Sequence, residues 1–401
     1  MNSSLLTTPP LSLYIHIPWC VEKCPYCDFN SHALKSKIPE VDYVDALIAD
    51  LDADITRFDL SERPLHSIFI GGGTPSLFSA SAIKSLLEQV LSRFKNDNDS
   101  PQKNIEITLE ANPGTVEADK FIAFAKAGVT RLSIGVQSFE SDKLLKLGRI
   151  HNVNQAKVAA TLAHESGVKS FNLDLMHGLP NQNLENALDD LKTAISLKPD
   201  HLSWYQLTIE PNTAFHSKPP QLPQDEVLWN IQDQGFKLLS DAGYQQYEIS
   251  AFRRVQNNKV DDKKCQHNLN YWNFGDYLGI GCGAHGKITD TKNSRILRTI
   301  KIKHPKGYLD PSREALDHLN TVTDDELPFE YMMNRLRLFS SFTLAEYQQR
   351  TGLAAETVLP ILRQAQSKKM MTCTDSFSTE GEWQVTQLGH RYLNDLLELF
   401  L

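Results

Sequence analysis

The chain has 401 residues, 41% of them hydrophobic, and a formal net charge of -8. This composition predicts a globular protein with one large core and a smaller second one, and the acidic balance excludes a broad surface for nucleic acid or an anionic membrane. No apolar run approaches the roughly 18 residues of a membrane span, so we expect a cytoplasmic protein.

Strand and helix patterns alternate along the first part of the chain. Residues 11–18 alternate like a β-strand, and residues 41–58 repeat apolar positions at helical spacing. The same pair recurs until six units are complete near residue 243. This alternation predicts a parallel sheet with right-handed crossovers, and six units are fewer than the eight of a closed barrel. We therefore predict an α/β fold with a partial (β/α)6 barrel, with a doubly wound sheet as the alternative.

Each of the first five predicted strands ends in a distinctive loop. The loops read CVEKCPYC, GGGTP, EANPG, GVQS and DLMHGLP. In a parallel barrel the loops that follow the strands gather at one rim and carry the functional residues. The sequence therefore predicts a single site at that rim.

The pattern changes beyond about residue 310, where helices, a short hairpin and a last helix resemble a winged-helix domain. We accordingly predict two domains, residues 1–310 and 311–401. Residues 342–401 carry 5 Lys or Arg against 7 Asp or Glu, so no basic face for DNA is expected. A packing or partner-docking role is the expectation for this domain.

Three cysteines, Cys20, Cys24 and Cys27, follow the first strand at the spacing C-x3-C-x2-C. Their thiolates can bind zinc if His16 or His32 completes the site, or they can hold three irons of a four-iron cluster. Structural zinc sites usually pair their ligands as C-x2-C repeats, so the spacing favours the cluster. The remaining cysteines are scattered singly and are predicted to be small buried side chains: Cys265, Cys282 and Cys373.

This loop, with Tyr26 before its last cysteine, resembles the signature of the radical S-adenosylmethionine (SAM) superfamily, and the GGGTP loop strengthens the resemblance. The resemblance implies that Cys20, Cys24 and Cys27 ligate a [4Fe-4S] cluster. It also implies that the amino and carboxylate groups of SAM bind the fourth iron. An electron from the reduced cluster would then cleave SAM into methionine and a 5'-deoxyadenosyl radical.

Other residues at the predicted rim match positions that contact SAM in the coproporphyrinogen III dehydrogenase branch of the superfamily. Glycines 71 to 73 allow close approach, and their N–H and C=O groups are expected to bind the methionine ammonium and carboxylate. By residue type alone, the polar members fit ordinary loop positions equally well. The resemblance assigns to SAM Tyr14, Tyr26, Gly72, Gly73, Thr74, Glu110, Gln137, Arg149 and Asp174.

Phe29 and a second motif bear on which function the chain has. The dehydrogenases continue C-x3-C-x2-C-x-C, and Phe29 stands where the additional cysteine would fall. The segment HNLNYW resembles the HNxxYW motif of heme chaperones in the superfamily, which implies an axial imidazole and aromatic faces for a porphyrin. Taken alone, the motif is more typical of core aromatics beside a structural histidine, and the missing cysteine reverses this preference. The implied heme-binding residues are His267, Asn268, Tyr271 and Trp272.

We predict a heme chaperone that binds a [4Fe-4S] cluster, SAM and heme, and that transfers heme to respiratory acceptor proteins. The alternatives are oxygen-independent coproporphyrinogen III dehydrogenation by radical decarboxylation, and simple electron transfer. Residues 287–306 hold seven Lys or Arg and one Asp, a charge expected either to meet heme propionates or an acidic partner, or to lie on a solvated hairpin. Expected partners are heme and its acceptors but no nucleic acid, with transient membrane association through an acceptor and a homodimer as one oligomeric form.

Overall fold

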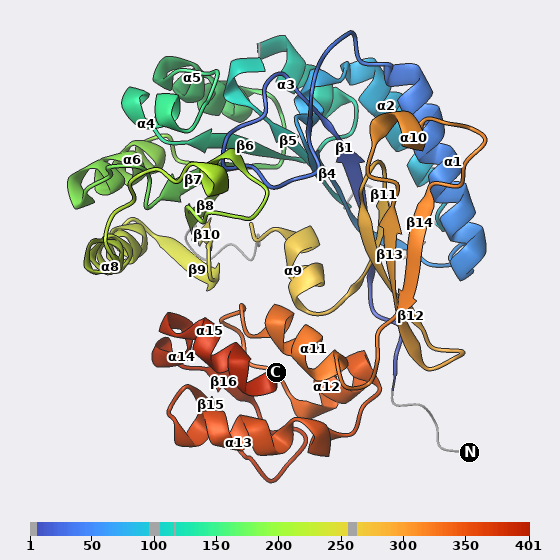
Figure 1. Cartoon of the computed structure of the whole chain (residues 1–401), viewed down its shortest axis with the longest axis vertical. Coiled ribbons are helices and arrows are strands. Elements are labelled where there is room, and N and C mark those ends of the chain that lie inside the picture. Colours follow the sequence, from blue (N-terminus) through green and yellow to red (C-terminus); the bar gives the residue numbers. More distant parts are fainter. Residues whose placement is uncertain (1–5, 96–104, 116–117, 256–262) are drawn as a thin grey trace.

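The computed structural model describes residues 6–95, 105–115, 118–255 and 263–401. A curved 12-stranded sheet carries helices on its outer face, and a mainly helical domain lies below it (Figure 1). Among the described residues, no helix combines the length and the apolar character needed to cross a bilayer. The six predicted parallel strands are β1 (Leu11–Ile17), β4 (Leu65–Gly72), β5 (Glu106–Ala111), β6 (Arg131–Gln137), β7 (Ser170–His177) and β8 (His201–Gln206).

These six strands lie side by side in chain order, each parallel to the next. A doubly wound sheet reverses its strand order at a switch point, so that alternative is wrong and the partial barrel is confirmed. The first two residues predicted for the third helix, 116 and 117, lie outside the described residues. The outer helices are α1 (Glu40–Phe58), α2 (Ala80–Leu91), α3 (Ala118–Lys126), α4 (Ser141–Lys146), α5 (Val153–Glu165), α6 (Leu184–Ser196) and α8 (Asp225–Asp241).

The sheet extends beyond the predicted strands at both edges. Strand β11 (Asp276–Ile280) joins β1 in parallel register, and antiparallel strands continue from there to one edge. At the other edge, β8 pairs with an antiparallel hairpin. The antiparallel strands are β9 (Tyr244–Glu248), β10 (Ala251–Arg254), β12 (His285–Asp290), β13 (Arg295–Lys301) and β14 (Leu316–Thr321).

Alternation along the parallel strands separates an apolar layer from a polar interior. On β1, Leu13 and Ile15 are fully buried in the large hydrophobic core, whereas Tyr14 and His16 point to the opposite face and contact each other. The inward-facing positions of the other parallel strands are mainly polar, as with Thr108 and Glu110 on β5, but Phe69 on β4 also faces this interior, which we call the lumen. A closed barrel of this type would instead fill its interior with layers of branched aliphatic side chains.

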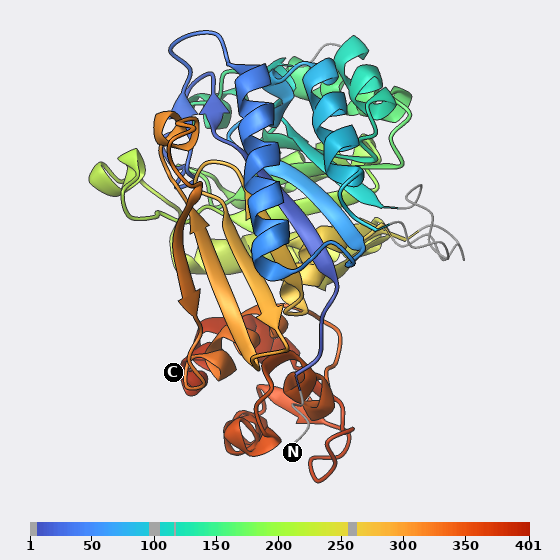
Figure 2. The same ribbon diagram turned by 90° about the vertical axis from the view of Figure 1, so that its right-hand side faces the viewer.

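The C-terminal domain has its own core, built around Tyr331, Tyr347 and Trp383, and Leu6 from the N-terminal segment packs into that core. In Figure 2 the N-terminal segment runs down to this domain. Because the sheet continues through Thr321, we propose a domain boundary near residue 322 in place of 310. The elements follow the predicted order: α11 (Leu327–Arg335), α12 (Leu344–Thr351), α13 (Leu359–Ser367), β15 (Met371–Cys373), β16 (Trp383–Val385), α14 (Gln387–Arg391) and α15 (Leu393–Leu397).

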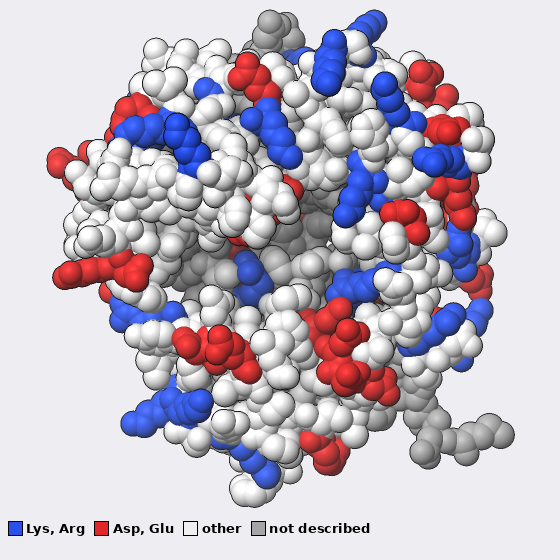
Figure 3. Space-filling model, in the orientation of Figure 1, with Lys and Arg blue, Asp and Glu red and all other residues white. Residues whose placement is uncertain are grey.

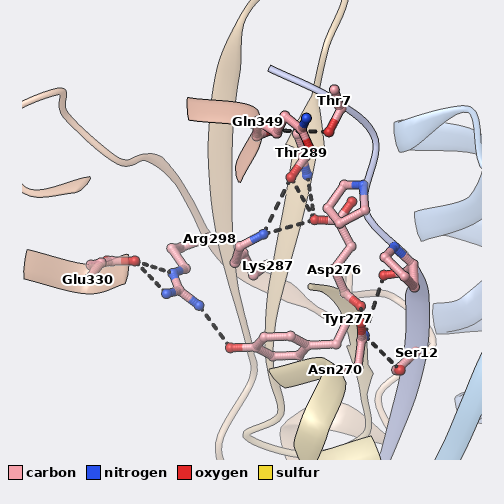
Figure 4. Close-up of polar contacts among 12 residues, drawn as sticks. Thr7, Ser12, Asn270, Asp276, Tyr277, Lys287, Thr289, Arg298, Glu330 and Gln349 are labelled. Carbon is pink, nitrogen blue, oxygen red and sulfur yellow. Dashed lines mark hydrogen bonds and ion pairs between the residues drawn. The ribbon is translucent and has the colours of Figure 1, made fainter. Parts of the chain in front are cut away.

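Ion pairs engage most of the basic segment 287–306. Asp276 is fully buried and accepts hydrogen bonds from Lys287 Nζ at 2.9 Å and from the Thr289 hydroxyl at 2.7 Å (Figure 4). Arg298 joins the sheet to the C-terminal domain through Glu330 (Figure 4). The expectation that this segment offers free positive charge to heme is therefore wrong for Lys287, Arg298 and Lys301, whose carboxylate partners are buried or half-buried. Lys292 and Arg295 also contact carboxylates but are exposed, as expected for a solvated hairpin.

Candidate functional site

The three motif cysteines lie on one loop at the upper end of the sheet. Strand β2 (Trp19–Cys20) pairs with β3 (His32–Ala33), and the carbonyl of Cys24 accepts a hydrogen bond from the amide of Cys27 at 3.1 Å. All three thiols are free and half-buried. Burial raises the pKa of Cys20 and of Cys27. The loop therefore presents three reduced sulfurs toward one space.

The donor set fits an iron-sulfur cluster better than a zinc ion. Within the described ranges, no three His, Cys, Asp or Glu side chains converge to hold a single metal ion. His16 is unavailable as a fourth ligand because Nδ1 lies 2.9 Å from the Tyr14 hydroxyl and Nε2 2.9 Å from the Asn30 carbonyl. Three thiols without a fourth protein ligand suit a four-iron cluster that keeps one iron open to a cofactor.

A cavity of about 380 Å³ opens beside the cysteine loop. It is lined from the carboxyl ends of the parallel strands, as the predicted rim requires. Tyr14 is absent from the lining, because its hydroxyl is turned toward His16. All other sequence-predicted cluster and SAM residues line the cavity: Cys20, Cys24, Cys27, Tyr26, Gly72, Gly73, Thr74, Glu110, Gln137, Arg149 and Asp174.

The glycine turn does not offer the free N–H groups that the sequence led us to expect. The amide of Gly72 donates to Glu110 Oε2 at 3.0 Å, and that of Gly73 donates to the Ile17 carbonyl at 2.7 Å. What the turn requires is the absence of side chains. Gly72 has a φ of 112°, and a Cβ on Gly73 would lie 2.6 Å from the carbonyl oxygen of Trp19, the residue before Cys20.

Two carboxyl groups face the cavity from β5 and β7, the strands on either side of β6. Burial, and then the charge of Asp174, raise the pKa of Glu110 to about 8. Burial also raises the pKa of Asp174, although Ser133 and Asn172 donate hydrogen bonds to it at 2.9 and 2.8 Å. Carboxyl groups with raised pKa values in a cavity are candidates for a functional site.

Arg149 connects the cysteine loop to the strands. Its Nη1 lies 3.4 Å from the sulfur of Cys24, and its Nη2 donates to the Gly135 carbonyl at 2.9 Å. The adjacent strand end is strained, since Gln137 has a φ of 69° and its side-chain oxygen accepts a hydrogen bond from the Tyr205 hydroxyl at 2.8 Å. Arg149 thus places a positive charge directly beside one of the three thiols.

The HNxxYW segment forms the short helix α9 (Gln266–Trp272), which lies between the barrel and the C-terminal domain (Figure 1). His267 is 8% exposed, and its Nδ1 lies 3.1 Å from the Ser67 hydroxyl, the only hydrogen bond that its ring makes with a described residue. Burial lowers the pKa of His267 to about 3, which keeps the imidazole neutral. A neutral imidazole with one nitrogen oriented and the other open is the form that ligates a metal.

The other motif residues surround this helix. Asn268 is half-buried, and the ring of Tyr271 packs 5.0 Å from that of Tyr277. The guanidinium of Arg337, from the C-terminal domain, lies 4.2 Å from the Trp272 ring. None of the four predicted heme residues lines the cavity beside the cysteine loop, so the two predicted sites are separate.

Hydrogen bonds through the lumen connect the two regions. Asn172, which donates to Asp174, accepts at 2.7 Å from His201, whose other ring nitrogen lies 2.7 Å from the Tyr247 hydroxyl. That hydroxyl accepts from the amide of Cys265, one residue before α9. Motif analysis missed these residues, although their alternate positions on the strands marked them as inward-facing.

Family comparisons agree with this geometry. A model of the radical SAM superfamily matches residues 14–194, and a model of the HemN C-terminal domain matches residues 322–389. The second match begins directly after β14, where the sheet ends. The fold, the three-cysteine loop and the cavity beside it define the class as radical SAM proteins with a HemN-type C-terminal domain.

Relatives of higher sequence identity show to which family within this class the chain belongs. The chain is 56% identical to the heme chaperone HemW of Haemophilus influenzae, over 98% of both chains. It is 54% identical to the heme chaperone HemW of Escherichia coli, over 99% of this chain and 100% of the relative. The chain therefore belongs to the HemW family. Coproporphyrinogen III oxidase (HemN) from Escherichia coli, described as a radical SAM enzyme, superposes with a TM-score of 0.79 at 25% identity, covering 98% of this chain and 90% of that one.

Proposed function

We propose that this protein is a heme chaperone that binds a [4Fe-4S] cluster, SAM and heme, and that hands heme to respiratory acceptor proteins. Membership of the HemW family supports this function. The single structural observation that carries it is His267, whose neutral imidazole is held at Nδ1 by Ser67, the only hydrogen bond of its ring with a described residue.

The cluster and SAM would occupy the cavity at the upper rim. The thiols of Cys20, Cys24 and Cys27 would hold three irons, and Arg149 would offset the negative charge beside Cys24. Glu110 and the Gln137 amide face the same space and are suited to polar groups of SAM. When bound, the cluster supplies single electrons.

Heme would bind at α9, on a different part of the lumen. In this assignment His267 supplies the axial nitrogen, and Tyr271 and Trp272 supply aromatic surface. Asn268, half-buried beside the histidine, completes the motif. Because the two sites are separate, loss of the cluster should leave most of the heme binding intact.

A heme titration tests the proposal. We expect a Soret band on heme addition to the parent, at least tenfold weaker binding in His267→Ala, and near-parental heme binding in a cluster-free Cys20→Ala variant. His318→Ala, which changes an exposed histidine, is the matched control. Parental heme affinity in His267→Ala would show that the motif is not the heme site.

The structural similarity to HemN over nearly the whole chain favours one competing function, coproporphyrinogen III dehydrogenation. The sequence difference that argues against it, Phe29, lies at the cavity and is 58% exposed. The anaerobic protein with reconstituted cluster, SAM and reductant should not convert coproporphyrinogen III to protoporphyrinogen IX. Steady turnover in that assay would replace the carrier function with an enzymatic one.

A further inference from the structure

Arg131 is a buried cation whose guanidinium has no direct hydrogen-bond partner in the described part of the chain. It is the first residue of β6, in the alternating set that includes Ser133 and Gln137, which line the cavity. Its side chain is 3% exposed, yet its guanidinium makes no direct hydrogen bond or ion pair with any described residue, and Nε is buried without a partner. Burial opposes its charge, but Cys265, Glu106, Tyr247 and Asp174 act on it electrostatically and raise the pKa of Arg131. Buried charges are normally paired, because removing an unpaired charge from water is costly. The nearby carboxylates balance the charge of Arg131 without touching it, so its N–H donors remain available for a direct hydrogen bond.

The other buried cations make the contrast clear. Each Lys or Arg that is buried to a similar degree in the described part of the chain has a direct partner within hydrogen-bond distance. The partners account for their burial, and only Arg131 lacks one. The paired residues are Lys143 with Asp142, Lys287 with Asp276, Lys301 with Asp50 and Arg335 with Ser340.

Arg131 lies in the same part of the lumen as His267. In the sheet register it is opposite Thr108, which is opposite Phe69, and the Phe69 ring is 5.1 Å from the His267 ring. Glu106, the nearest carboxylate on β5, acts on Arg131 electrostatically but does not contact its guanidinium directly, and its Oε1 accepts hydrogen bonds from the amide of His267 and the thiol of Cys265. The face shown in Figure 3 is deeply hollowed at its centre, where Figure 1 places α9 and the inner side of the sheet.

We propose that Arg131 binds a carboxylate of the ligand held at His267, so that a heme propionate forms the direct ion pair that no described residue makes with this guanidinium. This inference rests on the proposed function. A guanidinium presents paired N–H donors in a plane that matches a carboxylate, and such contacts fix orientation as well as strength. Arg131 would thereby set which edge of the porphyrin enters the lumen. The basic segment cannot do this with its five paired residues.

Heme and its dimethyl ester, which lacks both carboxylates, test the proposal by titration of the Soret band. The parent should bind heme about 10- to 100-fold more tightly than the ester, as expected for a charge-assisted contact. In Arg131→Gln, heme binding should weaken by a similar factor and the preference for heme over the ester should disappear. Arg298→Gln, which removes a paired arginine of the basic segment, should keep the preference.

Folding and SAM binding complete the test. Arg131→Lys keeps the charge but not the planar fork, so it should fold as the parent does and show an intermediate preference for heme; a full parental preference in this variant would contradict the proposal. SAM affinity measured by calorimetry should be unchanged in Arg131→Gln. If SAM affinity falls while the preference for heme persists, the carboxylate belongs to SAM and the proposal is wrong. Equal binding of heme and its ester by the parent protein would also contradict the role of Arg131. If the parent protein binds neither, the proposed function itself is wrong.

Discussion

Replacement of Arg149 should shift the reduction potential of the cluster. Its Nη1 lies 3.4 Å from the sulfur of Cys24, so Arg149→Gln removes a positive charge at the edge of the cluster. The added electron spreads over the cluster, so its centre is taken as about 6 Å from the guanidinium. Two unit charges at about 6 Å interact by about 1.4–2.8 kcal/mol at an effective dielectric of 20–40, which corresponds to about 60–120 mV for one electron.

The direction of this shift in reduction potential follows from the positive charge of Arg149. Reduction adds negative charge, and the positive guanidinium stabilises that state, so its loss should make the potential more negative. The assay is an anaerobic redox titration followed by electron paramagnetic resonance of the reduced cluster. Arg149→Lys is the control, because it retains the charge and should stay within about 30 mV of the parent, a small part of the predicted shift. An unchanged potential in Arg149→Gln would refute the placement of Arg149 beside the cluster.

Three further predictions concern the scaffold around the sites. Asp276→Asn leaves Lys287 buried without a counter-ion and should lower the free energy of unfolding by about 3–5 kcal/mol. The control, Asp52→Asn, removes one partner of an exposed ion pair and should lower it by less than about 1 kcal/mol. Burial opposes ionisation of Asp276, but Lys287 and Arg63 hold its pKa below the usual value, so the difference measured by urea unfolding should persist at pH 5–7 and shrink below about pH 4. The pKa of Glu110 is about 8 in the native state and about 4.5 when unfolded, so its contribution to stability falls as the pH rises between these values. In Glu110→Gln, the free energy of unfolding measured by denaturation should therefore decrease less over this pH range. Gly73→Ala places a methyl group 2.6 Å from the Trp19 carbonyl oxygen and should reduce iron bound per chain after reconstitution at least twofold, whereas normal iron content would show that the turn tolerates a side chain.

Sequence patterns predicted the elements whose signals are local. Each of the six parallel strands is followed by an amphipathic helix, and each of the first five carries an unusual loop at its carboxyl end, so the order and the rim could both be predicted. Strand β11 was missed because it follows α9 and is continued by hairpin strands, with no alternating helix to mark it. Its place beside β1 depends on parallel pairing between residues about 265 positions apart, which no local pattern records.

The candidate site likewise has features that local sequence predicts and features that depend on the folded chain. The cysteine loop and the glycine loop could be recognised from the sequence, because the spacing of their residues is what a cluster and a close backbone approach require. The hydrogen bonds that engage the amides of Gly72 and Gly73 could not be predicted, because their acceptors, Glu110 and Ile17, come from other strands. The absence of a direct partner for Arg131 likewise depends on where Glu106 points in the folded chain.

The central claim is that this chain carries heme to other proteins, and heme transfer measures it most directly. The reconstituted protein, loaded with one heme and kept anaerobic with SAM, is mixed with a heme-free respiratory cytochrome, and the absorbance of each protein is followed after rapid separation. We predict that heme moves to the cytochrome and that His267→Ala, loaded at the same heme concentration, transfers at least tenfold less. Retention of heme by the parent, or equal transfer from His267→Ala, would contradict the account.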